Sequence, residues 1–326
     1  MMAIWAELHT FLIYAVFGYL LIYPLLLGCL RFFAIKDPGQ RRLLYLLALS
    51  MPLVGFAAYH SIFLKQCEGG HFIFGTTPEY LHLLCLLSDF ALQYTSPILA
   101  LVLTAGLLKA VTAALFTRRL TANAVNPEPG LADRITKITR RRAAELGITP
   151  PALVYSRRKG FAALSAGLLK PGIILNHNLL ADLSLEELDF IITHELVHVR
   201  RRDNIKTWLV NLVRDLVIFN PISTVLLRQI DYETERICDR EAAKLTGLDG
   251  QKAAAILIKV WKRLAAEKLS KPVLVSAFSA GPTGMERRVI TFINNESQTP
   301  PASFSVFGSL VLLLIASSLI YFGILC

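Results

Sequence analysis

Four long apolar stretches constrain what this chain can fold into more than any other feature of its sequence. None of them contains Asp, Glu, Lys or Arg, and each is close to the roughly 20 residues that a helix needs to cross a bilayer. They lie at residues 11–30, 43–64, 90–108 and 304–325. The sequence therefore predicts a multi-pass α-helical membrane protein, with three transmembrane helices in residues 1–118 and a fourth in residues 304–326.

Basic residues between these stretches predict their orientation, because cytoplasmic loops accumulate Lys and Arg. The first loop and the start of the central segment are rich in basic residues, whereas residues 65–80 hold a single Lys. We therefore expect an inner-membrane protein with the bilayer as a partner, residues 119–303 in the cytoplasm and both termini outside. This bias accounts for the formal net charge of +10. Since no groove-reading motif accompanies the basic run at 140–142, no direct nucleic-acid partner is expected.

The central segment, residues 119–303, has the composition of an ordinary folded domain with both helices and strands. A helix is expected at about 131–146, and three short strands are expected at 151–156, 161–166 and 172–176. A second helix is expected to begin after Ser184, because Ser followed three residues later by Glu is the pattern of a capping box. The five cysteines show no paired spacing, and only a bridge between Cys67 and Cys326 is left open.

The helix after Ser184 carries the pattern His194-Glu195-Leu-Val-His198. Histidines four residues apart project from the same face of a helix, so both imidazoles can reach one metal ion. Glu195 lies beside them and can act as the general base toward a water activated by zinc. A pair of histidines in the hydrophobic core is the alternative. The capped amphipathic helix favours a catalytic metal site.

A carboxylate must complete such a site, because no histidine follows His198. Glu235 and Asp239 are four residues apart on an expected helix, so one can bind the metal while the other orients a histidine. A solvated charged face paired with Arg236 and Arg240 is the simpler alternative. Two further carboxylates, Glu233 and Glu241, are the next candidates for the third ligand. Three residues have the chemistry to stabilise an oxyanion, namely Tyr232, Arg287 and Arg288.

The sequence resembles the BlaR/MecR-type integral-membrane metallopeptidases, peptidase family fifty-six. The resemblance rests on the stretches 170–175, 194–203, 219–221 and 235–239. It implies a gluzincin-type α+β domain between the third and fourth transmembrane helices, with one zinc ion. It also implies that His194, His198 and Glu235 bind the metal and that Asp239 supports a ligating histidine. Family members that sense β-lactams carry a sensor domain after the last span, and because this sequence stops at Cys326, antibiotic sensing is not expected.

The expected activity is that of a zinc metalloendopeptidase in regulatory proteolysis, with Glu195 as general base. The resemblance implies a protein or peptide substrate, such as a cytoplasmic transcriptional repressor or the protease itself. One alternative is a membrane quality-control protease of the heat-shock or prenyl-protein type. Another is a non-proteolytic membrane receptor that keeps zinc for structure, although such a site needs no Glu195. The sequence leaves a homodimer open.

Overall fold

The structure is a computed structural model. It describes residues 2–58, 125–157, 161–167, 171–217, 220–268 and 282–293, with a few single positions between 104 and 115. The described chain divides into two compact units. The first contains the N-terminal helices and Val210–Ile230. The second contains the described residues of Lys109–Leu209 and Asp231–Pro300.

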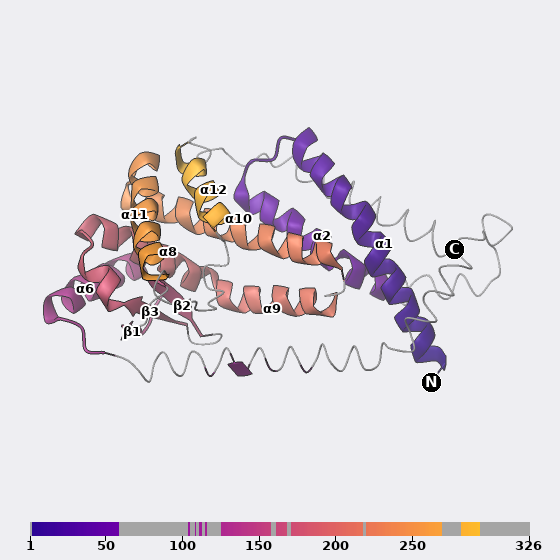
Figure 1. The fold of residues 1–326 in the computed structure, drawn as a ribbon, viewed down its shortest axis with the longest axis horizontal. Helices are drawn as coiled ribbons and strands as arrows, with labels where there is room; N and C mark the ends of the chain where they lie inside the picture. Colours follow the sequence, from indigo (N-terminus) through magenta and orange to yellow (C-terminus); the bar gives the residue numbers. More distant parts are fainter. Residues whose placement is uncertain are drawn as a thin grey trace. The chain divides into compact units, whose positions relative to one another are not determined.

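The first unit is built mainly from helices α1 (Met2–Phe32) and α2 (Pro38–Ala58) (Figure 1). Helix α2 begins after Asp37, whose carboxylate accepts a hydrogen bond of 3.0 Å from the backbone N–H of Gln40 and so satisfies one of the free amides at the helix start. A hydrogen bond connects the two helices: the Tyr19 hydroxyl of α1 donates to the backbone carbonyl of Leu49 in α2 at 2.7 Å. Their buried side chains form one core with apolar residues from Val210–Ile230.

The predicted multi-pass membrane architecture is contradicted by the described helices. Over those residues, no helix combines enough length with enough apolar character to cross a bilayer. The predicted span at 11–30 lies inside α1 and the one at 43–64 begins inside α2, while 90–108 and 304–325 lie outside the described elements. Some apolar residues of α1 and α2, such as Leu26 and Leu44, are buried in a shared core, whereas others, such as Leu20 and Leu21, are exposed. A helix that is apolar on most sides fits a protein core as well as it fits a bilayer, which is why the sequence pattern misled.

The predicted cellular location depended on the predicted spans, so it is corrected as well. An inner-membrane position, a cytoplasmic central segment and two outside termini were all expected because of the predicted spans and the loop charges between them. Since no spanning helix is found in the described part of the chain, these expectations are wrong. The pair Cys67 and Cys326 lies outside the described residues, and the described cysteines Cys29 and Cys238 are both buried.

The second unit contains a three-stranded sheet with the order β1-β3-β2 among the described residues. Strand β1 (Leu153–Ser156) runs parallel to β3 (Gly172–Asn176), and β2 (Ala163–Ala166) runs antiparallel to it. All three strands fall where the sequence predicts them, β1 and β2 with shorter bounds and β3 with the predicted ones. The order leaves β2 at one edge of the sheet, where it packs against helix α8 (Leu185–Arg201).

Helix α8 begins where the sequence predicts. The Ser184 hydroxyl accepts from the Glu187 backbone N–H at 3.2 Å, and the Glu187 carboxylate accepts from the Ser184 backbone N–H at 2.8 Å. This reciprocal pair is a capping box. Burial of Leu188, Ile192 and Leu196 on one face contributes about 1.5–3 kcal/mol for each side chain. The helix ends at Arg202, which adopts the left-handed conformation with φ of 54°.

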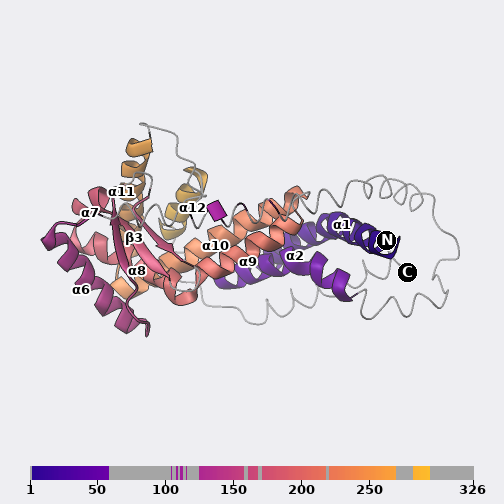
Figure 2. The same ribbon diagram turned by 90° about the horizontal axis from the view of Figure 1, so that it is seen from below.

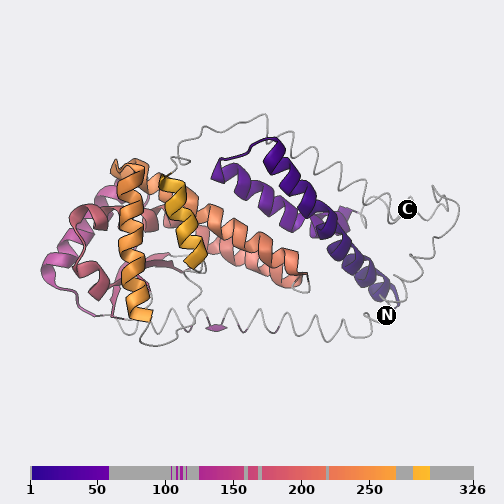
Figure 3. The same ribbon diagram turned by 45° about the horizontal axis from the view of Figure 1, so that its top comes forward.

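Six further described helices belong wholly or partly to this unit. These are α6 (Pro129–Glu145), α7 (His177–Ala181), α9 (Asp203–Leu216), α10 (Pro221–Thr246) and α11 (Gly250–Lys268), followed by α12 (Pro282–Ile293). Helix α6 packs along α8, as Figure 2 shows, and α12 lies beside α11 in Figures 1 and 3. The sequence placed Glu235 and Asp239 on a helix, and both lie in α10.

Candidate metal centre

Helix α8 presents two imidazoles side by side. His194 and His198 are one helical turn apart, and their Nε2 atoms lie 3.2 Å from each other. The rings meet edge to face with centroids 4.8 Å apart. Residues four positions apart on a helix share a face, so this proximity follows directly from their spacing. Both side chains are 11% exposed, which leaves the facing nitrogens inside the protein.

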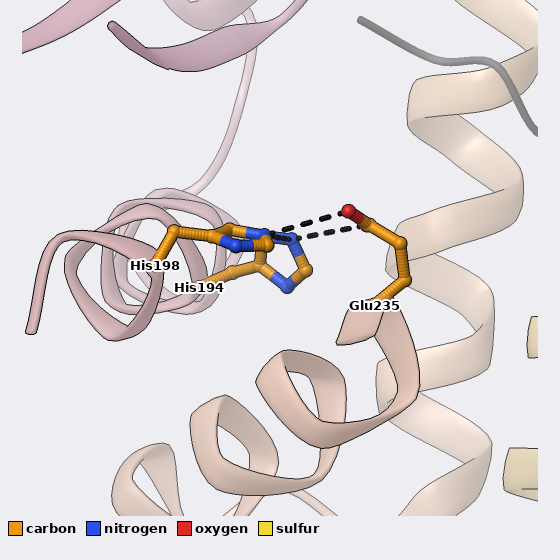
Figure 4. Close-up of side chains that lie close together, drawn as sticks. All are labelled: His194, His198 and Glu235. Atoms are coloured by element: carbon orange, nitrogen blue, oxygen red, sulfur yellow. Dashed lines mark hydrogen bonds and ion pairs between the residues drawn. The ribbon is translucent and has the colours of Figure 1, made fainter. Parts of the chain in front are cut away.

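Glu235 of α10 supplies the third donor group. Its Oε2 lies 3.5 Å from His194 Nε2 and its Oε1 lies 3.5 Å from His198 Nε2. Figure 4 shows the two imidazoles and the carboxylate pointing toward one another from two helices. The Glu235 side chain is 29% exposed, so solvent reaches the group from this side.

These three donors fit a zinc ion. Two ligand atoms bound at about 2.0–2.1 Å in a tetrahedral arrangement lie about 3.3–3.4 Å apart. The 3.2 Å between the two Nε2 atoms and the 3.5 Å from each of them to one oxygen of Glu235 are close to this separation. Two imidazole nitrogens and one carboxylate oxygen also form a donor set of the kind found in catalytic zinc sites, where the fourth position stays open.

A second carboxylate stands behind each imidazole. Asp239 Oδ1 lies 3.1 Å from Nδ1 of His194, one turn of α10 after Glu235. The sequence predicts that Glu235 and Asp239 share a face, and the structure brings both to His194. A carboxylate at Nδ1 favours the tautomer that carries its proton there, which leaves the Nε2 lone pair directed at a metal. The buried position of Asp239 excludes a solvated charged face at this point of the helix.

Asp203 is the carboxylate that lies at the Nδ1 of His198. No role was assigned to it from the sequence. Its Oδ2 lies 3.1 Å from His198 Nδ1, and Arg201 Nε donates to the same oxygen at 3.2 Å. Asp203 is the first residue of α9 and follows the left-handed Arg202, which turns the chain back toward α8. The only signal in the sequence was an Asp five residues after His198 in the run that carries the resemblance.

The thiol of Cys238 lies beside this pair. Its Sγ is 3.4 Å from His198 Nδ1 and 3.6 Å from Asp203 Oδ2. Burial and the nearby carboxylate of Asp203 raise the pKa of the Cys238 thiol well above its ordinary value. The group therefore stays a thiol that donates to Asp203. These three side chains are close enough to bind an ion together, but the thiol and the carboxylate both lie at Nδ1 of His198 and not at the Nε2 that faces His194 and Glu235, so we interpret them as a hydrogen-bonded network.

Glu195 is placed for a different role. It follows His194 directly in the sequence of α8. Its Oε2 accepts a hydrogen bond of 2.8 Å from the backbone N–H of Ser165 in β2. The residue is 7% exposed. The edge strand thus fixes the orientation of this carboxylate, which is not a member of the set His194, His198 and Glu235.

The two other candidates for the third ligand, Glu233 and Glu241, form ion pairs with arginines. Glu233 is fully buried and pairs with Arg236 at 2.7 Å on the same helix, and Glu241 pairs with Arg200 of α8. Among the three oxyanion candidates, Tyr232 bonds to Thr291 of α12 at 3.2 Å and lies under the guanidinium of Arg287.

Arg288, the last of these candidates, contacts carboxylates instead of an open position. Its Nε and Nη2 donate to the two oxygens of Asp239 at 2.7 and 2.6 Å, and its Nη1 lies 3.0 Å from Glu235 Oε2. The donors of Arg288 are therefore directed at the α10 carboxylates. No oxyanion role follows for it from this geometry.

The charges around the donor group shift the pKa values of its members in opposite directions. Burial alone would lower the pKa of His194, but its contacts with Asp239 and Glu235 raise that pKa to about 10. Burial alone would raise the pKa values of Glu235 and Asp239, but Arg288 and His194 hold both well below their usual range. Without a metal, the group is therefore an imidazolium surrounded by carboxylates.

Comparison with known proteins agrees with this chemistry. Residues 88–292 match the family described as BlaR1 peptidase M56. The chain is 26% identical to the regulatory protein BlaR1 of Bacillus licheniformis over 140 residues, which is 42% of this chain and 22% of the relative. It is 32% identical to the methicillin resistance mecR1 protein of Staphylococcus aureus over 79 residues, which is 24% of this chain and 14% of the relative.

The matched regions thus cover about a fifth or less of these curated relatives, so what the whole relatives do is not carried over by the similarity alone. The family match is broader: it extends over well more than half of this chain and includes both histidines of α8, Glu195 and the carboxylates of α10. The chain therefore belongs to the BlaR1 peptidase M56 family.

Proposed function

We propose that this protein is a zinc metalloendopeptidase that cleaves protein substrates in regulatory proteolysis. The observation that carries the proposal is the convergence of His194, His198 and Glu235: the two Nε2 atoms lie 3.2 Å apart, and each lies 3.5 Å from one oxygen of Glu235, spacings that suit a single zinc ion. The peptidase family supports a protein substrate, and the fit of the donors supports zinc as the metal.

In this proposal the side chains divide the work. His194, His198 and Glu235 hold the ion, while Asp239 and Asp203 keep the two imidazoles in the tautomer that binds it. Zinc, when bound, lowers the pKa of water and polarises the scissile carbonyl. Glu195 accepts the proton of the attacking water and returns it to the leaving amine, which is general acid–base catalysis by one carboxylate.

A purely structural metal site is a poorer explanation of the same residues. Structural zinc sites are closed by four protein ligands, whereas catalytic sites keep one position open. Here three donors converge, and Cys238 lies on the far side of His198 at its Nδ1. A buried carboxylate at Glu195 that takes no part in the donor set has a clear use only if a proton has to be moved.

The substrate is proposed to lie along β2 in an extended conformation. The strand order places β2 at the sheet edge, and it packs on the helix that carries Glu195. An extended segment can add to such an edge through main-chain hydrogen bonds. In line with regulatory proteolysis, we propose a transcriptional repressor or the protein itself as the polypeptide that is cleaved.

Replacing Glu195 with Gln tests this function. The variant keeps the three donors, so it is expected to bind one zinc ion and fold like the wild type, yet to lose cleavage of an unfolded protein substrate because the water loses its proton acceptor. Zinc is quantified by elemental analysis, and cleavage is followed by mass spectrometry with and without a chelator. Wild-type cleavage that survives complete removal of metal, or a Glu195→Gln variant with full activity, would contradict the proposal.

A further inference from the structure

The buried guanidinium of Arg288 connects α12 to both carboxylates that face the imidazoles. It grips Asp239 through two hydrogen bonds of 2.6 and 2.7 Å and lies 3.0 Å from Glu235 Oε2 through its third nitrogen. The residue is 3% exposed. A planar guanidinium with fixed donor directions dictates the planes and positions of the oxygens that it binds.

We infer that Arg288 positions Glu235 and Asp239 for metal binding, so that α12 sets the metal affinity of the site. This inference rests on the proposed function, because it takes Glu235 as a zinc ligand. Arg288 would then act on the metal through Glu235 and Asp239. Helix α12, which is distant in sequence from the two histidines of α8, would be part of the metal centre.

The side chain of Glu235 needs such a partner. A glutamate has three rotatable bonds, and at 29% exposure this one has room to turn toward solvent. In the observed orientation each of its oxygens lies 3.5 Å from a different imidazole. The contact with Arg288 favours that orientation before any ion arrives, which is preorganisation of a ligand by its surroundings.

Asp239 is held even more closely. Its Oδ1 accepts from Arg288 Nη2 at 2.6 Å and also lies 3.1 Å from His194 Nδ1. One oxygen therefore links the cation of α12 to an imidazole of α8. If Arg288 is removed, two neighbouring buried carboxylates lose their compensating charge and repel each other, so both are expected to leave their present positions.

Helix α12 docks on the face of α10 that carries these carboxylates. Tyr232 lies one turn before Glu235, and its hydroxyl bonds to Thr291 of α12 at 3.2 Å. The guanidinium of Arg287 lies 4.2 Å from the centre of the Tyr232 ring. The same face therefore carries the docking contacts and the metal-facing carboxylates, and any change in the seating of α12 reaches Glu235 through Arg288.

The test compares Arg288→Met and Arg288→Lys with a matched control, Arg236→Met. Arg236 also forms a buried ion pair on α10, with Glu233 at 2.7 Å, but it does not touch the donor group. Zinc affinity is measured by competition with a chromophoric chelator, and the fold is checked by circular dichroism. We expect zinc affinity to fall about 10–100-fold in Arg288→Met, as it does when partners of metal ligands are removed.

Arg288→Lys is expected to lose less zinc affinity than Arg288→Met, because an ammonium supplies the positive charge but not the paired N–H donors of a guanidinium. Arg236→Met is expected to lose thermal stability while its zinc affinity stays that of the wild type. In a double variant, Asp239→Asn with Arg288→Met, the loss should be smaller than the product of the two single losses, since both changes break one interaction. A loss equal to that product would mean that Arg288 acts independently of Asp239.

The outcomes separate this inference from the proposed function. Zinc binding by the wild type together with unchanged affinity in both Arg288 variants would overturn the inference and leave the proposed function standing. A wild-type protein that binds no zinc would overturn both. If Arg288→Met does not fold, Arg288→Lys decides: weaker zinc binding in an intact fold supports the inference, and wild-type affinity refutes it.

Discussion

Asp203 and His198 are joined across the end of one helix and the start of the next, with a carboxylate oxygen 3.1 Å from the imidazole Nδ1. The contact mirrors that of Asp239 with His194, so each imidazole of α8 has its own carboxylate partner. Replacing Asp203 with Asn should weaken zinc binding about 10–100-fold by removing the negative charge that favours the binding tautomer. Chelator competition measures this, with the exposed Asp182→Asn as control. Full affinity in Asp203→Asn would show that the pairing has no effect on the metal.

Glu235 and Glu233 offer a second comparison, between two carboxylates two residues apart on α10. Replacing Glu235 with Ala should abolish most zinc binding, because one of three donors is lost and metal binding energy is shared with folding. Replacing Glu233 with Ala should lower stability by leaving buried Arg236 without its partner, but zinc should still bind. Elemental analysis and thermal unfolding of both variants check this. Retention of zinc by Glu235→Ala would move the third ligand elsewhere.

The raised pKa of His194 predicts that zinc displaces a proton. With a pKa of about 10 in the metal-free protein, His194 is protonated at pH 7, and zinc binding at Nε2 should release about one proton. Zinc affinity should therefore increase as the pH rises from 7 toward 10. Titration calorimetry in buffers of different ionisation enthalpy measures the released proton. A binding enthalpy that does not depend on the buffer would contradict the expectation.

The raised pKa of His194 also predicts that the metal-free protein becomes less stable as the pH rises, whereas its zinc affinity increases. A raised pKa means that protonated His194 stabilises the folded protein. This contribution is complete below the ordinary value of 6.5 and is lost as the pH rises through about 10. Thermal unfolding of the chelator-treated protein should therefore shift to lower temperature across this range. A His194→Gln variant should lack this part of the pH dependence.

Arg142 ties α6 to α8 and tests the packing behind the site. Its guanidinium binds both oxygens of Asp189, at 2.9 and 2.6 Å, and the carbonyl of Leu245 at 2.7 Å. Replacing it with Ala should lower the free energy of unfolding by about 1.5–3 kcal/mol, because the partly buried carboxylate of Asp189 loses the guanidinium that binds both of its oxygens. Arg141 also contacts Asp189 but is 55% exposed, so Arg141→Ala should cost at most about 1 kcal/mol. Denaturant unfolding of both variants checks the difference, and equal losses would contradict it.

Local signals explain what the sequence could predict. The capping box at Ser184 and Glu187 is read from two residues three positions apart, and it fixes where α8 begins. The two histidines then face one side because of helical spacing alone. The strands at β1 and β3 were also visible as short apolar runs between turns. The pairing of Glu235 with these histidines was expected through the family resemblance as well as the helical spacing.

Contacts between distant parts of the chain explain what the sequence did not reveal. Asp203 reaches His198 only because Arg202 adopts a left-handed conformation, which its neighbours in the sequence do not dictate. Arg288 was considered as an oxyanion donor, since nothing in the sequence shows that its guanidinium meets Asp239. The apolar stretch at 11–30 fitted a bilayer as well as a core, and the outcome depended on the partners that pack against α1.

The order of the site's parts along the chain has a consequence for biosynthesis. The edge strand comes first, the two histidines follow, then the carboxylates of α10, and the cation of α12 comes last. A polypeptide that has emerged from the ribosome only as far as α10 already carries its donors, but it lacks the charge that holds two of its carboxylates in place. The positioning charge that we infer for Arg288 is therefore the last part of the centre to be synthesised, after the proposed zinc ligands.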